Sequence, residues 1–250
     1  MTGRGAEESL PLRKRDATAL MVLIPGETGM EERGHEPPEE RLLHRMLFFS
    51  DAVFAIVMTL LVLELRPPQA EAVAQNAEAL WKMASHLGAF AFSFAVISIF
   101  WLVHMNTTRQ LARFDWATAV VNLVFLFPVC LLPFLSAWLG DGFNDPFSWG
   151  LYSGLLVATS AASIALVLVT TRDGGRLMIS PVDRRDRAFR IVRAASPGLA
   201  FLLSLLVLAS GHLHVAQFCP VLIPGILWLA GRLLGKKAAG AQVPTDAPAG

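Results

Sequence analysis

Polar side chains stand at the start of one long apolar segment of the sequence. Arg45, Ser50 and Asp51 open the run RMLFFSDAVFAIVMTLLVLEL, which ends at Leu65 and carries one further charge, Glu64. A charge inside such a segment is costly unless another protein group satisfies it, and such charges commonly mark ion pathways or proton relays. The chemistry expected of this segment is therefore the passage of an ion or a proton.

His104 is the predicted partner of Asp51, because the two residues lie at similar depths in neighbouring antiparallel helices. Asp51 follows Arg45 by six residues, about 9 Å along a helix, and His104 precedes Arg109 by five residues, about 7.5 Å. We expect a hydrogen-bonded cluster of Ser50, Asp51 and His104. Arg45 either joins this cluster or extends its side chain to the membrane surface. Such a cluster either locks the first helix in place or acts directly in permeation or gating.

An apolar stripe runs along a different face of the same segment. Its members are Phe49, Ala52, Ile56, Leu60 and Leu63, with Thr59 at its edge. Positions 49, 52, 56, 59 and 63 are spaced alternately by three and four residues, as in a seam between helices. At 100° per residue, Asp51 points about 140° away from Ile56. The stripe either contacts lipid or a neighbouring helix, as most apolar stripes do, or forms the wall of a pore built from several copies. Periodicity does not decide between these alternatives.

Six stretches are long enough to position these residues across a bilayer, which requires about 20 apolar residues per crossing. They are Leu42–Leu65, Leu80–Met105, Trp116–Leu139, Phe147–Thr170, Ala194–Ser210 and Val215–Leu234. The composition agrees, with 16% charged residues against roughly 25% in soluble domains. The sequence predicts an all-α integral membrane protein, with a six-helix transmembrane domain over residues 41–236 between disordered tails at 1–40 and 237–250.

Prolines within these stretches predict local irregularities. Pro197 lies near the start of the fifth stretch, where a proline is tolerated because a first-turn N–H has no intrahelical partner. Pro128 and Pro133 in the third stretch and Pro220 and Pro224 in the sixth predict kinks, which membrane helices accommodate through neighbouring groups.

Basic residues alternate between the two ends of the predicted helices. They gather before the first stretch, between the second and third, between the fourth and fifth, where there are seven arginines, and after the sixth. The other connections are poor in Lys and Arg. This pattern predicts that both termini are cytoplasmic.

Several function classes are disfavoured by the composition. A net charge of +1 and long apolar runs argue against a nucleic-acid partner. Cys130 and Cys219 lie singly in apolar runs, so no disulfide framework or metal-binding cysteine pattern is expected. His212 and His214 form only an H-x-H pair, which we interpret as two polar loop residues. We predict no metal site and no bound cofactor.

The polar residues of the first segment also spell a motif. Arg45, Phe49, Ser50 and Asp51 read R-x-x-x-F-S-D, which resembles the signature of the transmembrane protein 175 family, endolysosomal potassium channels and their bacterial relatives. The continuation AVFAIVMTLLVLEL and the run Phe100–His104, FWLVH, are similar to that family's first and second helices. The resemblance covers about residues 41–171. Met105 departs from it, since many bacterial members have a second histidine there.

The resemblance implies a potassium-selective channel rather than an enzyme. It implies a homotetramer of six-helix subunits in a bacterial cytoplasmic membrane, with lipid and monovalent cations as its partners and potassium as the permeant ion. The family lacks the T-V-G-Y-G filter, as does this chain. By resemblance the first helix lines the pore, with the constriction at Ile56 and with Thr59 or Leu60 and Leu63 further along.

Other functions remain open from the residues alone. A proton-coupled secondary transporter could use Asp51 and His104 as a relay, although no internal repeat is evident. An intramembrane hydrolase using Ser153 would lack the G-x-S-x-G elbow. An accessory membrane subunit without transport activity is a further alternative.

Overall fold

The computed structural model describes residues 37–65 and 77–234, and the regular structure within them is almost entirely helical. The α-helices are α2 (Pro38–Leu63), α4 (Ala77–Thr108), α5 (Trp116–Asp141), α6 (Pro146–Thr170), α7 (Arg184–Ala209), α8 (Leu213–Phe218) and α9 (Leu222–Leu234). Two short 3-10 helices, η2 (Arg172–Gly174) and η3 (Cys219–Val221), lie between them. Most of the predicted tails 1–40 and 237–250 lies outside the described residues, although α2 already begins at Pro38.

Each of the six predicted stretches corresponds to a span that is long and apolar enough to cross a membrane. The six-helix, all-α prediction is therefore confirmed. The largest difference in bounds concerns the fifth stretch, because α7 begins at Arg184 rather than at Ala194. Its first turns are rich in arginine, so an apolar run could not reveal them.

Pro197 consequently lies inside α7, and the prediction that it occupies a first turn is wrong. A proline in a helix interior leaves the carbonyl four residues earlier without its usual donor. Here the Ser196 hydroxyl donates to that carbonyl, on Arg193, at 2.9 Å. The local sequence Ser-Pro thus supplies the donor that the proline removes.

A serine from α6 also enters the backbone ladder of α7 at this point. The Ser160 hydroxyl donates to the Ala194 carbonyl at 2.7 Å and accepts from the Gly198 N–H at 2.9 Å. It therefore stands between two groups that would bond directly in a regular helix. A Cβ on Gly198 would lie 2.5 Å from the Ser160 Cβ, so glycine permits this close approach of α6 and α7.

Replacing Gly198 with alanine should destabilise the protein by about 1–3 kcal/mol, because the added methyl group overpacks this contact. The matched control is Gly154→Ala on α6, where the new Cβ meets no atom within 4 Å. That substitution should be neutral or slightly stabilising, since alanine favours a helix. Thermal unfolding in detergent measures both. Equal melting temperatures for the two variants would contradict the close α6–α7 contact.

The sixth span is interrupted where its prolines predict an irregularity. Instead of one helix, the chain forms α8, a 3-10 turn containing Pro220, and α9. Pro224 falls in the first turn of α9, a position that tolerates proline. α5, in contrast, is assigned as one helix through Pro128 and Pro133.

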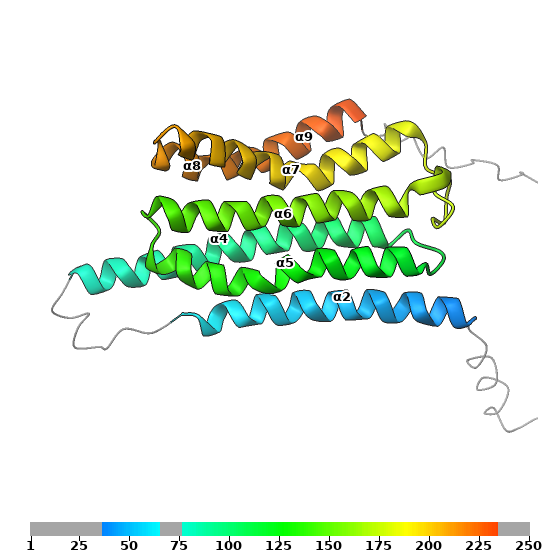
Figure 1. Cartoon of the computed structure of the whole chain (residues 1–250), viewed down its shortest axis with the longest axis horizontal. Coiled ribbons are helices and arrows are strands. Elements are labelled where there is room, and N and C mark those ends of the chain that lie inside the picture. Colours follow the sequence, from blue (N-terminus) through cyan, green and yellow to red (C-terminus); the bar gives the residue numbers. More distant parts are fainter. Residues whose placement is uncertain (1–36, 66–76, 235–250) are drawn as a thin grey trace, which may run out of the picture. The chain divides into compact units, whose positions relative to one another are not determined.

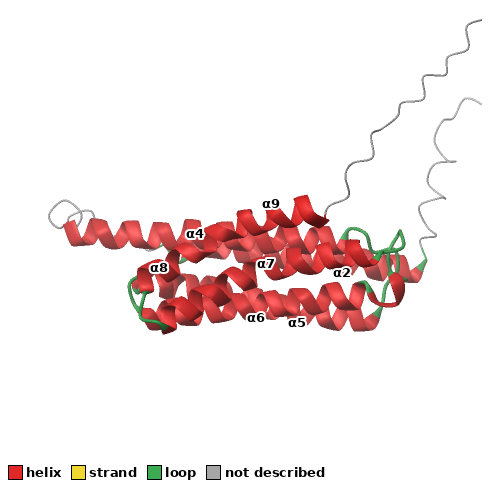
Figure 2. Ribbon diagram, turned by 90° about the horizontal axis from the view of Figure 1, so that it is seen from above, coloured by secondary structure: helices red, strands yellow, loops and turns green. Residues whose placement is uncertain are grey.

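The helices run alongside one another, and successive spans point in opposite directions (Figure 1). The start of α2 and the end of α9 consequently lie at the same end of the bundle, as an even number of crossings requires (Figure 1). The view turned by 90° also shows the long helices aligned (Figure 2). A core of apolar side chains from α2, α4, α5, α6 and α7 holds them together, including Phe54, Phe100, Phe125, Tyr152 and Phe201.

α2 is the least buried of the six spans. Only 22% of its membrane-length window is buried, compared with 50% for α5. The helix that carries the candidate functional residues therefore lies at the margin of this bundle and presents most of its surface outward.

Candidate functional site

α2 has two distinct faces. Its buried face consists of Leu43, Ser50, Phe54, Val57 and Leu61. The apolar stripe predicted from the sequence lies elsewhere and is uncovered, with Ile56 57% exposed and Leu63 72% exposed. The stripe therefore does not pack against the other described helices of the same bundle. It remains available to lipid or to another copy of the chain.

A buried polar network ties the inner face of α2 to two other helices. The Asn122 side-chain amide on α5 donates to the Ser50 hydroxyl at 2.8 Å, and its carbonyl oxygen lies 2.8 Å from the His104 Nε2 on α4. The Ser50 hydroxyl in turn donates to the Met46 carbonyl at 3.0 Å. Ser50, His104 and Asn122 are all buried.

The direction of these hydrogen bonds assigns the proton on His104. Because the Asn122 nitrogen donates to Ser50, the Asn122 oxygen faces His104 and can only accept, so Nε2 carries a hydrogen. The His104 Nδ1 is buried and has no hydrogen-bond partner among the described residues. Phe125 stacks on the imidazole with ring centroids 5.2 Å apart, and Phe54 covers it at 5.7 Å.

Asp51 lies outside this network, which corrects the predicted Ser50–Asp51–His104 cluster. Its Oδ1 accepts a hydrogen bond from the Trp101 Nε1 at 3.1 Å, and the residue is exposed. Successive residues on a helix point 100° apart, so Ser50 and Asp51 do not both face His104. Asn122 occupies the place expected for Asp51, and an amide within the apolar third stretch was the signal that could have revealed it.

The two other residues of the motif point away from the network. Arg45 and Phe49 are exposed, and within the described ranges Arg45 makes no hydrogen bond or ion pair with the network. Of the motif's polar residues, Ser50 thus faces the bundle and Asp51 lies at its outer edge against Trp101. Among the described residues, no hydrogen-bonded path joins Asp51 to His104, as the alternative of a proton relay would require.

Thr59 is the polar member of the apolar stripe. It is exposed, and its hydroxyl donates back to the helix, with its oxygen 2.8 Å from the Ile56 carbonyl and 3.0 Å from that of Ala55. Because the hydroxyl hydrogen is held by the backbone, the oxygen lone pairs remain available on the outward side. Such an oxygen is suited to a cation and not to an anion.

The helix that carries Asn122 is fixed at its start by a cap and an ion pair. The Asp115 carboxylate accepts from the Thr118 N–H at 3.0 Å and pairs with Arg172 at 2.9 Å. Burial raises the pKa of Asp115, but the Thr118 hydrogen bonds and the Arg172 charge outweigh it and hold that pKa below its ordinary value. These contacts join the beginning of α5 to η2, directly after α6.

Residues 45–133 match the family model described as "Endosomal/lysosomal potassium channel TMEM175". A potassium channel of Streptomyces collinus is 32% identical over 66% of this chain and 86% of its own length. One of Chamaesiphon minutus is 34% identical over 60% of this chain and 76% of its own length. The mouse endosomal/lysosomal proton channel TMEM175 is 22% identical over 85% of this chain, which spans only 44% of the mouse protein.

The fold also matches a solved structure. The crystal structure of a lysosomal potassium-selective channel TMEM175 homologue from Chamaesiphon minutus aligns with a TM-score of 0.64 at 24% identity, over 76% of this chain and 98% of the other. That likeness establishes a shared fold, and the bacterial relatives match over most of their own lengths. This chain therefore belongs to the TMEM175 family of membrane channels.

Proposed function

We propose that this chain is the subunit of a potassium-selective channel whose pore is lined by α2 from four copies. The observation that carries the proposal is the uncovered apolar stripe, which bears one exposed hydroxyl, Thr59. One copy of a helix cannot enclose a pore, whereas a closed cyclic assembly can. The names of the Streptomyces and Chamaesiphon relatives, both potassium channels, support the choice of ion.

The stripe supports a simple mechanism of gating and selection. Rings of Ile56, Leu60 and Leu63 would form narrow apolar constrictions, which block ions by excluding the water that hydrates them. Rings of Thr59 oxygens would replace part of that water for an ion passing through. Potassium gives up water more readily than sodium does, so partial dehydration favours potassium. Conduction then requires no T-V-G-Y-G filter.

The polar network and Asp51 have supporting roles in this proposal. Asp51 points about 140° away from Ile56, so it stands behind the pore wall rather than in it. Its bond to Trp101 on α4 and the Ser50–Asn122–His104 network together hold α2 against α4 and α5. The pore wall is thus supported at the end of α2 that carries the motif.

The distribution of charge supports an orientation in a bacterial cytoplasmic membrane. Arg109, Arg113, Arg172 and Arg176 lie in connections at the end of the bundle where α2 begins and α9 ends. Lys and Arg concentrate on the cytoplasmic side of membrane proteins. We therefore place both termini in the cytoplasm, with lipid and monovalent cations as the partners of the assembled channel.

Ion flux through the full chain in liposomes tests the pore assignment. Wild type should pass potassium in preference to sodium, and Ile56→Ala and Leu63→Ala should each raise the leak and weaken this preference by widening the constriction. Leu206→Ala on α7 is the matched control, since Leu206 is also exposed but lies on another helix.

Two outcomes would overturn the proposal. Unchanged conductance in both Ile56→Ala and Leu63→Ala would remove the stripe from the ion path. Flux that follows a proton gradient and is independent of potassium would favour a proton pathway, the activity named for the mouse relative. A pH-sensitive dye inside the same liposomes reports that second outcome.

A further inference from the structure

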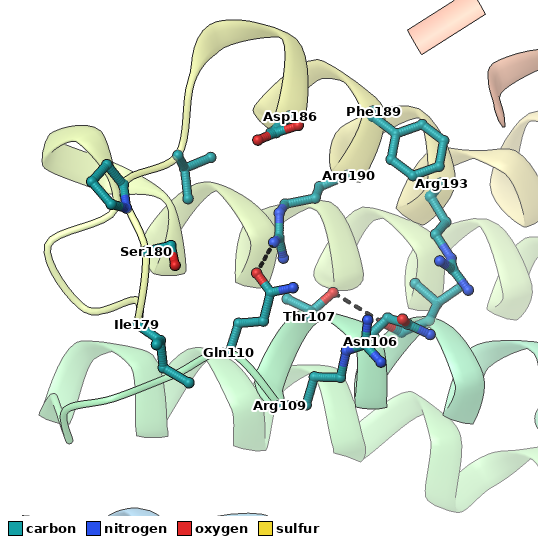
Figure 3. A pocket seen from close by; sticks show the side chains of 13 residues that line it. Asn106, Thr107, Arg109, Gln110, Ile179, Ser180, Asp186, Phe189, Arg190 and Arg193 are labelled. Atoms are coloured by element: carbon teal, nitrogen blue, oxygen red, sulfur yellow. Dashed lines mark hydrogen bonds between the residues drawn. The ribbon is translucent and has the colours of Figure 1, made fainter. Parts of the chain in front are cut away.

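A pocket of about 540 Å³ lies between the end of α4 and the start of α7, away from the apolar stripe. Its volume is within the range of about 300–1,000 Å³ that is typical of small-ligand sites. Asn106, Arg109 and Gln110 contribute from α4 and the residues after it, and Arg190 and Arg193 from α7. Figure 3 shows Arg190 and Arg193 extending from α7 toward the end of α4. We call this space the arginine pocket.

The arginine pocket carries more positive charge than its own side chains neutralise. Three guanidinium groups, those of Arg109, Arg190 and Arg193, share it with one carboxylate, that of Asp186, among the described lining residues. Arg109 repels both Arg190 and Arg193, which are half-buried. Like charges held together in a partly buried space lower stability unless a counter-charge joins them.

The hydrogen bonds of these arginines leave much of their donor capacity unused. Arg190 donates to the neutral side-chain oxygen of Gln110 (Figure 3). Within the described part of the chain, neither Arg109 nor Arg193 lies within ion-pair distance of a carboxylate. A guanidinium presents five donors in a planar fork, and this geometry matches the oxygens of a phosphate group.

Backbone hydrogen bonds hold one wall of the pocket in place without a ligand. Residues 179–182 form it, and the Ile179 N–H donates to the Gln110 carbonyl at 2.9 Å while the Val182 N–H donates to the Gly174 carbonyl at 3.0 Å. A further bond from the Ala112 N–H to the Leu177 carbonyl, at 2.8 Å, pairs the two connecting segments. A preformed wall avoids the cost of ordering a loop on binding.

We propose that the arginine pocket binds an anionic phosphate group. Apolar side chains line the space beside the guanidinium groups, namely Val103, Ile179, Pro181, Val182 and Phe189. The phosphate could belong to the headgroup of an anionic phospholipid, whose chains would follow this apolar side, or to a soluble phosphate compound. The bound group would join α4 to α7 through charge-assisted hydrogen bonds. This inference does not depend on the pore assignment.

Binding to the purified full chain in detergent tests the proposal with four probes: dioctanoyl phosphatidic acid, dioctanoyl phosphatidylcholine, inorganic phosphate and ATP. Saturable binding of phosphatidic acid, with none for phosphatidylcholine, phosphate or ATP, identifies a lipid headgroup as the source. Saturable binding of phosphate or ATP identifies a soluble source. If none of the four binds saturably, the proposal is overturned.

Charge-matched variants locate the site. Arg109→Gln and Arg193→Gln should each weaken binding by about tenfold or more, because each removes a charge-assisted hydrogen bond to the phosphate group. Arg187→Gln is the control, because Arg187 is exposed on the same helix, does not line the pocket and removes the same charge. Equal weakening in Arg187→Gln would show attraction by overall charge alone and overturn the site.

A conservative variant separates a loss of binding from a loss of folding. Arg193→Lys keeps the charge but loses the planar fork, so its affinity should fall between those of wild type and Arg193→Gln. Arg109 is exposed, and Arg109→Gln should leave the melting temperature without ligand unchanged or slightly raised. Wild-type affinity in both Arg109→Gln and Arg193→Gln would contradict the proposal.

Discussion

Replacing Asn122 with alanine should lower the free energy of unfolding by about 2–5 kcal/mol, a large part of the stability of an ordinary domain. The side chain joins Ser50 on α2 to His104 on α4 through two hydrogen bonds of 2.8 Å. Its removal leaves a buried hydroxyl and a buried imidazole N–H without these partners, and each unsatisfied group costs about 1–3 kcal/mol.

The melting temperature in detergent measures this effect, with Asn106→Ala as the control. Asn106 is a half-exposed asparagine on α4 whose amide donates to the Leu102 carbonyl of its own helix. A double-mutant cycle between Asn122→Ala and Ser50→Ala then isolates the contact. Additive effects of the two substitutions would show that the pair does not hold α2 to α5.

Phe54→Ala should destabilise the protein by about 3–5 kcal/mol, because it removes a large buried side chain and leaves a cavity. Phe54 is 1% exposed and packs against His104 and Phe125, with ring centroids 5.7 Å and 6.1 Å away. The expected consequence is a loosened α2, so the proposed preference for potassium should fall together with the melting temperature when the variant is reconstituted.

Phe48 offers a matched control on the same helix. It is 77% exposed, so Phe48→Ala removes the same side chain without creating a cavity in the core. Its melting temperature should remain close to that of wild type. Equal destabilisation by the two substitutions, or a greater effect of Phe48→Ala, would mean that α2 is turned the other way and that the apolar stripe faces the bundle.

Hydropathy was sufficient to find the six spans, because a bilayer demands a long apolar run from every crossing helix. It placed the start of α5 at Trp116 and the end of α6 at Thr170 correctly. It missed the first ten residues of α7, since Arg184–Arg193 is helical but polar. The insertion of the Ser160 hydroxyl from α6 between the Ala194 carbonyl and the Gly198 N–H, beside Pro197, is a contact that no local pattern reveals.

The polar site was predicted in part. Depth along the helices correctly brought Ser50 and His104 into one network, because distance along a helix follows from residue number. The rotation of each helix about its axis does not follow from residue number. In the structure, Asp51 faces Trp101 and Asn122 faces His104. The apolar stripe was found from periodicity, whereas its exposure is known only once the whole bundle is packed.

The Ser160 hydroxyl of α6, which is inserted into the backbone of α7, separates that helix into two segments. A helix in which a neighbouring side chain replaces a backbone hydrogen bond bends there more easily than elsewhere. The pocket arginines Arg190 and Arg193 precede this point, whereas Phe201 and Ser204, which pack in the bundle, follow it. We therefore expect any bending of α7 to be concentrated near Pro197, between the part that carries the pocket arginines and the part that packs in the bundle.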